Sequence, residues 1–413
     1  MRSENDALMS VALLLDEVDL DHKTIHLFDS WASTGKKLAT EKDYYKHLDE
    51  HLNDEDDLVK KAALLKTKDE KIAFLYNEVK THIGWNGYES WRSAEGIKSA
   101  WKKKVGNSAE VNAALCHLLR KSGIKAYPML VSSRENGLLD PNFVNVFQLN
   151  NLVTYVPIDS TKYYVLDATN KYYTYNEIPY NLLNSYGLCL NKDDDKYDMV
   201  FMETKAPSNE LIAINGEIGA DAKMKGTAQI VSYGYNRTGD LEIYKTSDEE
   251  KYKEFLTEKD NNIKISNLKL ENAEIDTLPL RQNFDFTFDL DNSDNYILFN
   301  PNIFTSLHDN PFLSEVRNSM VDFGYANRHR IFGRYKIPAG YNVESLPKDA
   351  TILIADKSLR FKRTLGKEDG YITLHYELDI TRTLFPKAEY PDLREFYKKM
   401  YDLLNEQIIL KKS

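Results

Sequence analysis

The spacing of apolar residues predicts two helices at the start of the folded part of the chain. Leu58, Ala62 and Leu65 repeat at helical spacing, and a second set follows at Ile72, Leu75, Tyr76, Val79 and Ile83. The polar run at residues 67–69 separates the two sets. We expect both helices to precede a turn at residues 84–87.

A third helix is predicted after residue 107. Its apolar face carries Val111, Leu115, Leu118 and Leu119, and Gly123 ends it. Ser108 stands at its start, and we expect the Ser108 hydroxyl to accept from a free backbone N–H as the N-cap.

Short β-rich runs follow the third helix, at residues 126–132, 144–156 and 163–168. Turn residues at 135–137 and at Asp159-Ser160 separate these runs. Helices that lead into an antiparallel sheet indicate an α+β layout.

The second half of the chain alternates apolar and polar residues, as half-buried strands do. One such run carries Phe284, Phe286, Phe288 and Leu290, and another extends from Ile372 to Ile380. Several runs of this kind predict a β-sandwich. Near the C-terminus, Pro391 is placed to begin a final helix that packs on the sandwich.

Changes in composition suggest three segments. Residues 1–57 combine an apolar stretch at 8–18 with an acidic end, and we interpret them as a leader or the remnant of an absent N-terminal domain. Residues 58–206 form the predicted α+β domain. The polar runs at 191–196 and 206–209 favour a boundary there, so residues 207–413 are the predicted sandwich domain.

Composition narrows the possible partners. The chain has 54 Lys plus Arg against 64 Asp plus Glu, a formal charge of −10, and its basic residues are scattered, which argues against nucleic acid. No apolar run is long enough to span a membrane. Cys116 and Cys189 have no metal-ligand partners at a useful spacing, so we expect no metal, cofactor or disulfide framework.

Several motifs carry a resemblance to a known family. Gly106-Asn-Ser-Ala-Glu-Val-Asn112, the following helix, Gly123 to Arg134 and Tyr164-Val-Leu-Asp-Ala-Thr169 resemble the core of bacterial transglutaminase-like proteins, which have a papain-type fold. Later motifs, among them Val321-Asp-Phe-Gly-Tyr325 and Ile337-Pro-Ala-Gly-Tyr341, extend the resemblance to a multidomain group with flanking β-sandwich domains of unknown function.

The resemblance implies a degenerate catalytic triad. Active relatives use a cysteine at the helix N-terminus, a histidine on a following strand and an aspartate on the next strand. The matching positions here are Ser108, Asn151 and Asp167. Serine without a base is a weak nucleophile, and an asparagine amide cannot accept and return a proton near neutral pH. Two of the three roles are therefore vacant.

The expected pairing of residues across a hairpin places Asn151 and Asp167 near each other. A turn at Asp159-Ser160 pairs residues whose numbers sum to 319, and Asn151 and Asp167 sum to 318. We expect these two side chains to form a hydrogen-bonded pair. Tyr163, Tyr164 and Tyr172 follow close by in sequence and are candidates to line a groove, although ordinary packing in strands also explains them.

Three functions remain open. The favoured one is a non-catalytic protein that binds a protein, peptide or glycan, or serves as a scaffold, at the bacterial cell envelope. The family is largely exported, so we expect export if a signal peptide has been removed. The alternatives are a residual hydrolase or acyltransferase that acts on peptide or glutamine amides with Ser108 as nucleophile, and carbohydrate binding by the sandwich. A His or Lys within hydrogen-bond reach of Ser108 would favour the hydrolase.

Overall fold

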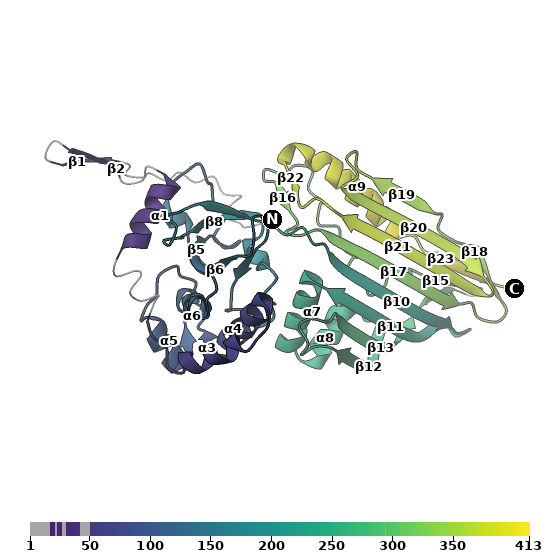
Figure 1. Ribbon diagram of the computed structural model, residues 1–413. Coiled ribbons are helices and arrows are strands. Elements are labelled where there is room, and N and C mark those ends of the chain that lie inside the picture. Colours follow the sequence, from purple (N-terminus) through teal and green to yellow (C-terminus); the bar gives the residue numbers. More distant parts are fainter. Residues whose placement is uncertain (1–16, 21–22, 27–29, 42–49, 294) are drawn as a thin grey trace. The chain divides into compact units, whose positions relative to one another are not determined.

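A computed structural model describes residues 17–20, 23–26, 30–41, 50–293 and 295–413, and shows a mixed α+β protein (Figure 1). The chain divides into two compact units, Met1–Thr204 and Lys205–Ser413. Most of the apolar stretch at residues 8–18 lies outside the described residues.

The first unit combines helices with a five-stranded sheet. Its helices are α1 (Trp31–Thr40), α3 (Glu55–Ala63), α4 (Lys68–His82), α5 (Ile97–Lys103) and α6 (Ser108–Lys121). Its strands are β1 (Glu17–Leu20), β2 (Lys23–His26), β3 (Gly84–Trp85), β4 (Val105–Gly106), β5 (Tyr127–Val131), β6 (Asn151–Pro157), β7 (Tyr163–Leu166), β8 (Ser185–Cys189) and β9 (Met199–Met202). The sheet has the order β7-β6-β5-β8-β9, and every pairing in it is antiparallel.

Helix α6 lies at the centre of this unit, and its residues from Ser108 to Leu119 are all buried. It packs against the sheet on one side, and α3, α4 and α5 gather around it on the other (Figure 1). The core includes Trp31, Leu38 and Leu52. Described parts of the predicted leader therefore share one core with α6, because Trp31 and Leu38 lie on the buried face of α1.

The second unit is built on an eight-stranded sheet of order β12-β13-β11-β10-β17-β21-β20-β19. Those strands are β10 (Ser208–Ile218), β11 (Lys223–Tyr233), β12 (Ile263–Glu271), β13 (Leu280–Asp289), β17 (Asn327–Lys336), β19 (Ala350–Leu353), β20 (Leu359–Glu368) and β21 (Tyr371–Ile380). Only β10 and β17 pair in parallel within this sheet.

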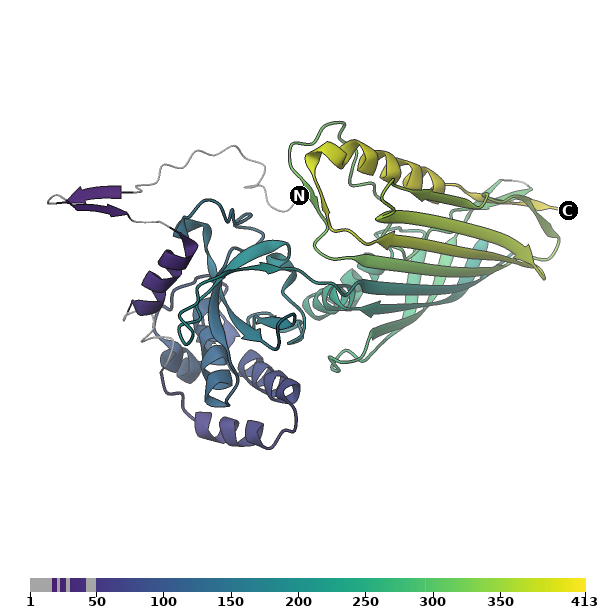
Figure 2. The same ribbon diagram turned by 45° about the horizontal axis from the view of Figure 1, so that its top comes forward.

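One face of the large sheet is covered by the remaining elements. These are a sheet of order β14-β15-β23-β18, the pair β16 and β22, and the helices. Their bounds are α7 (Tyr235–Thr246), α8 (Glu249–Leu256), β14 (Asp291–Ser293), β15 (Tyr296–Phe299), β16 (Val321–Asp322), β18 (Tyr341–Ser345), β22 (Leu384–Phe385), α9 (Tyr390–Leu404) and β23 (Ile408–Lys412). Pro391 lies in the first turn of α9, as expected, and Figure 2 shows α9 along one face of this unit.

The alternation of residues along the long strands decides which side chains enter the core. Phe284, Phe286 and Phe288 point inward on β13, and Ile372 to Ile380 do so at every second position on β21. They meet apolar residues of α9 and of β15 and β23. The intervening side chains form the opposite, polar face of the large sheet.

Candidate functional site

Helix α6 begins at the predicted nucleophile position, but Ser108 does not cap it. The N-cap is Asn107, whose side-chain oxygen accepts from the Glu110 amide at 3.0 Å, while the Glu110 carboxylate accepts from the Asn107 amide at 2.9 Å. The prediction of a Ser108 cap is therefore wrong. The partners of a capping box lie three residues apart in sequence, and Asn107 and Glu110 meet that spacing, so Ser108 becomes the first helical residue.

The Ser108 side chain is enclosed by a neighbouring loop. Its hydroxyl donates to the Ser90 carbonyl at 3.0 Å and accepts from the Ser90 amide at 2.9 Å. The Ser108 amide donates to the Tyr88 carbonyl at 3.2 Å. Ser108 is only 1% exposed, and all its hydrogen bonds in the described structure go to backbone. We call residues 88–95, which lie over the start of α6, the cover segment.

Two further contacts hold the cover segment in place. Strands β3 and β4 pair in parallel, so that the chain leaves β3 beside the entry to α6. The Glu110 carboxylate accepts from the amides of Ala94 and Glu95 at 2.9 and 2.6 Å, in addition to its capping contact. The first turn of α6 thus organises the segment that encloses Ser108.

Asp167 and Asn151 are also buried, with 5% and 2% exposure. Asp167 follows β7, and its carboxylate accepts from the Asn112 amide group at 2.9 Å and from the Thr169 amide and hydroxyl at 3.0 and 2.8 Å. Asn151 begins β6, and its side-chain oxygen accepts from the Leu152 amide at 2.7 Å. Burial raises the pKa of Asp167, and the bonds from Asn112 and Thr169 oppose that shift.

The expected hydrogen-bonded pair of Asn151 and Asp167 does not form within the described chain. Thr154 pairs with Leu166 and Pro157 with Tyr163, so partner numbers sum to 320 and Asn151 lies beyond the last pair of the hairpin. Asn151 instead pairs with Val131 on its other side. The sum differs from the expected 319 because the turn is centred on Ser160. The Asp159 carboxylate sets this turn by accepting from the amides of Thr161 and Lys162.

Asn112 connects the helix to both strands at this place. Its amide group donates to the Leu152 carbonyl at 2.8 Å as well as to Asp167, and its oxygen accepts from the Ala168 amide at 2.8 Å. The sequence analysis missed Asn112 as a site residue. The available signal was its position one helical turn after Ser108, on the same face of α6.

A half-buried carboxylate lies at the entry to β6. Glu89, in the cover segment, accepts from the Ser133 hydroxyl at 2.8 Å and from the Asn150 amide group at 2.5 Å. Burial raises the pKa of Glu89, and the nearby charges of Glu135 and Asp167 add to the shift. These contacts place the cover segment beside the start of β6, where Asn151 stands. No spacing in the sequence pointed to Glu89.

The imidazoles whose positions are described in the first unit contact residues other than Ser108. His117 lies in the body of α6, and its Nε2 is 2.8 Å from a Glu55 oxygen. His51 contacts the other Glu55 oxygen at 2.7 Å. His82 stacks on Trp101 at 4.0 Å between ring centroids and contacts the Trp101 carbonyl. None of these three rings is bonded to Ser108, whose side-chain partners are the Ser90 backbone groups.

The three candidate tyrosines do not line one groove. Tyr163 and Tyr164 are successive strand residues and enter different core clusters on opposite faces of the sheet. The Tyr163 hydroxyl donates to the Phe201 carbonyl, and the Tyr164 hydroxyl donates to Asp69. Tyr172 is half-buried in the loop after β7. A pocket of ≈ 430 Å³ on this unit is lined by Tyr127, Tyr155 and Cys189, among others, and by none of the candidate site residues.

The cysteines and acidic residues suggest no further chemistry in the described chain. Cys116 and Cys189 are both buried, and burial raises the pKa of Cys189 to about 12. Where the structure describes the chain, no three His, Cys, Asp or Glu residues are grouped so as to hold a metal ion. In that same part, no helix combines the length and apolar character that crossing a bilayer needs.

Comparisons with known proteins give one family match, over part of the second unit, and one similar fold. Residues 294–410 match a family described as a domain of unknown function with a solved structure (DUF3858). No curated protein matches the sequence. The fold is similar to the crystal structure of a "putative protease" from Parabacteroides distasonis, with a TM-score of 0.53 and 12% identity. That similarity covers 98% of this chain and 64% of the other, so this chain spans less than two thirds of that protein.

Proposed function

We propose that the first unit is a transglutaminase-like domain of papain type that has lost catalysis, and that the protein binds a partner or acts as a scaffold. The order of its elements supports this assignment. Ser108 begins the central helix, Asn151 begins β6 and Asp167 follows β7. This is the order in which the cysteine, histidine and aspartate occur in the family that the sequence resembles.

The observation that carries the proposal is the pair of hydrogen bonds between Ser108 and Ser90. A nucleophilic hydroxyl must give its proton to a base and must reach the substrate. The Ser108 hydroxyl instead donates a hydrogen bond to a peptide carbonyl, and the cover segment shields it from solvent. The residue at the histidine position is Asn151, whose side-chain oxygen accepts from the Leu152 amide, and an amide cannot take up and return a proton near neutral pH.

Exposed aromatic side chains around the enclosed site support a binding role. Tyr88 is 66% exposed in the cover segment, and Trp85 precedes it at 41%. Phe147 is 80% exposed and lies three residues before Asn150, which contacts Glu89 of the cover segment. The Trp85 indole N–H donates to the Tyr88 carbonyl at 3.1 Å, which keeps these two exposed residues together, and exposed apolar surface of this kind is typical of recognition sites. A peptide or unfolded protein segment suits such a surface, and the resemblance to exported proteins favours the cell envelope as its location.

The catalytic part of the proposal is tested by turnover. We expect the wild type to release no product from general peptidase, amidase and amine-incorporation substrates, at a level indistinguishable from Ser108→Ala. Activity in the wild type that Ser108→Ala abolishes would favour the residual hydrolase or acyltransferase instead.

The binding part is tested with an array of random peptides. We expect Tyr88→Ala combined with Phe147→Ala to remove most of the wild-type signal. Leu64→Ala serves as the matched control, because Leu64 is 84% exposed near the end of α3, away from the cover segment in sequence. Equal signals from all three proteins would contradict a recognition surface at this place.

A further inference from the structure

The polar face of the eight-stranded sheet contains a groove outside the site described above. Five of its lining side chains project from neighbouring strands, namely Asn215, Thr227, Gln229, Asn283 and Asp285. Cross-strand pairing places Asn215 beside Thr227, Thr227 beside Asp285 and Gln229 beside Asn283. With Ala213, Asn267 and Lys269 they enclose ≈ 570 Å³. That volume is in the range of small-molecule sites.

The groove retains hydrogen-bonding groups that the protein does not use. The Gln229 amide group donates to the Asn283 oxygen at 2.7 Å, which leaves the Gln229 carbonyl oxygen open. Asn267 donates to one Asp285 oxygen at 2.6 Å, which leaves the other open. The exposed Asn215 side chain forms no hydrogen bond within the described chain. The floor therefore offers the open acceptor oxygens of Gln229 and Asp285 together with the donor and acceptor of Asn215.

An aromatic ring borders this floor on the side of β17. Phe332 is 43% exposed and pairs with Ala213 on β10 and with His375 on β21. Its ring stacks on His375, with centroids 4.4 Å apart and an interplanar angle of 13°. One face of the Phe332 ring is thus covered by His375, while on its other side the cross-strand neighbour of Phe332 is Ala213, a small residue that lines the groove.

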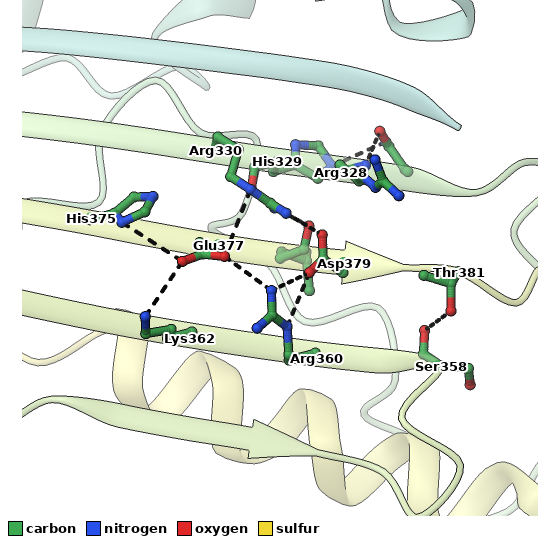
Figure 3. Close-up of polar contacts among 12 residues, drawn as sticks. Arg328, His329, Arg330, Ser358, Arg360, Lys362, His375, Glu377, Asp379 and Thr381 are labelled. Carbon is green, nitrogen blue, oxygen red and sulfur yellow. Dashed lines mark hydrogen bonds and ion pairs between the residues drawn. The ribbon is translucent and has the colours of Figure 1, made fainter. Parts of the chain in front are cut away.

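Beyond Phe332 the same sheet face is occupied by charges that neutralise one another. Figure 3 shows Arg330 and Arg360 both bonded to Asp379, at 2.5 and 2.8 Å, with Glu377 between Arg360 and Lys362. These groups hold β17, β20 and β21 together. Arg334, the cross-strand neighbour of Asn215 on β17, stacks on the Tyr371 ring at 3.7 Å. Inside the groove, Lys269 and Asp285 balance each other.

We propose that this groove binds a neutral oligosaccharide. Neighbouring sugar hydroxyls both donate and accept, so amide and carboxylate side chains set on adjacent strands pair with them in register. The C–H side of a pyranose ring carries partial positive charge and packs on the negative face of an aromatic ring, here the open face of Phe332. The balance of charge in the groove favours an uncharged ligand over a phosphate or an acidic glycan. The inference concerns the second unit and does not depend on the function proposed for the first.

The test uses the full chain and a panel of maltohexaose, cellohexaose, xylohexaose, mannohexaose and chitohexaose. Saturation-transfer difference NMR identifies a binder, and calorimetry gives its Kd, which we expect at about 1 mM or tighter. Phe332→Ala, and Asn215→Ala combined with Gln229→Ala, should each weaken binding about tenfold or more. Leu353→Ala is the matched control, because Leu353 is 48% exposed on β19, the edge strand of the same sheet.

Three outcomes would overturn the proposal. One is that no oligosaccharide of the panel binds at millimolar concentration. Another is that binding is unchanged in the groove variants. The third is that only a heparin hexasaccharide binds and that salt abolishes its binding, which would indicate charge-driven association. Phe332→Leu keeps the volume without the aromatic face, so it replaces Phe332→Ala if the alanine variant does not fold, and it should also lose binding.

Discussion

The hydroxyl of Ser108 and the backbone of Ser90 satisfy each other completely, with one hydrogen bond in each direction at 3.0 and 2.9 Å. The side chain at the proposed position of the nucleophile therefore acts as a structural clamp. It fastens the cover segment to the first turn of the central helix.

We expect Ser108→Ala to lower the free energy of unfolding. The variant leaves both Ser90 backbone groups without their partner, which costs about 1–3 kcal/mol. Ser122→Ala is the control, because Ser122 ends the same helix and its buried hydroxyl has no partner in the structure as described. Urea titration should give a lower midpoint for Ser108→Ala and a midpoint near wild type for Ser122→Ala. Equal midpoints would show that the clamp contributes nothing.

Asn112 should be a larger determinant of stability than Ser108. Asn112→Ala removes three buried hydrogen bonds, to Leu152, Asp167 and Ala168, and we expect a loss of roughly 3 kcal/mol. Asn112→Asp should be pH-dependent, because it sets a second carboxylate against Asp167. The two like charges raise both pKa values, so stability should fall as the pH rises above about 4.

The control for this pair is Asn77→Asp, at an exposed position of α4. Urea midpoints at pH 4 and pH 7 should diverge for Asn112→Asp and should change little relative to wild type for Asn77→Asp. The interpretation of Asn112 as the link between α6 and the strands fails if both variants behave alike.

We expect the stability of the second unit to depend on pH because of Asp240. Burial and then the charge of Glu210 raise its pKa to about 7, against the hydrogen bonds from Ser232 and Gln282. The folded state thus holds a proton that the unfolded state has lost between pH 4 and 7. Stability from this group is present at low pH and declines as the pH rises through that window.

Asp240→Asn should remove that decline, since the amide keeps an oxygen for Ser232 and Gln282 and never ionises. We expect its melting temperature to exceed that of wild type increasingly from pH 4 to pH 7. Glu242→Gln, on the same helix, should follow the wild-type profile. A difference between Asp240→Asn and wild type that does not vary with pH would rule out the titration of Asp240 as its source.

The second unit should fold by itself, because its large core is drawn from residues after 211. A fragment of residues 205–413 should unfold in a single cooperative transition in urea. Gradual loss of far-UV signal without a transition would mean that this core needs the first unit.

Local patterns predicted much of the fold. The alternating residues of β13 and β21 and the helical spacing in α9 each specify one buried face, and those faces are buried in the structure. The spacing in α6 also predicts one buried face, but there every residue from Ser108 to Leu119 is buried. Successive residues of a strand point to opposite faces of the sheet, so Tyr163 and Tyr164 could not line the same groove, and the sequence alone was enough to show this.

The parts that could not be predicted depend on contacts between distant segments. The pairing of β3 with β4 and the contact of Glu89 with Asn150 bring the cover segment over Ser108, and neither leaves a periodic signal. The choice of Asn107 over Ser108 as the N-cap concerns a single position. Either residue is a favourable cap, and the spacing to Glu110 decides between them.

The central claim is that Ser108 is not a nucleophile, and labelling with a fluorophosphonate probe tests it most directly. Mass spectrometry of the native, folded protein would locate any adduct after exposure to the probe at neutral pH. We predict no adduct at Ser108, because its hydroxyl is bonded to the Ser90 carbonyl and has no basic side chain among its partners. An adduct at Ser108 that forms on the native protein and not after unfolding would contradict the account.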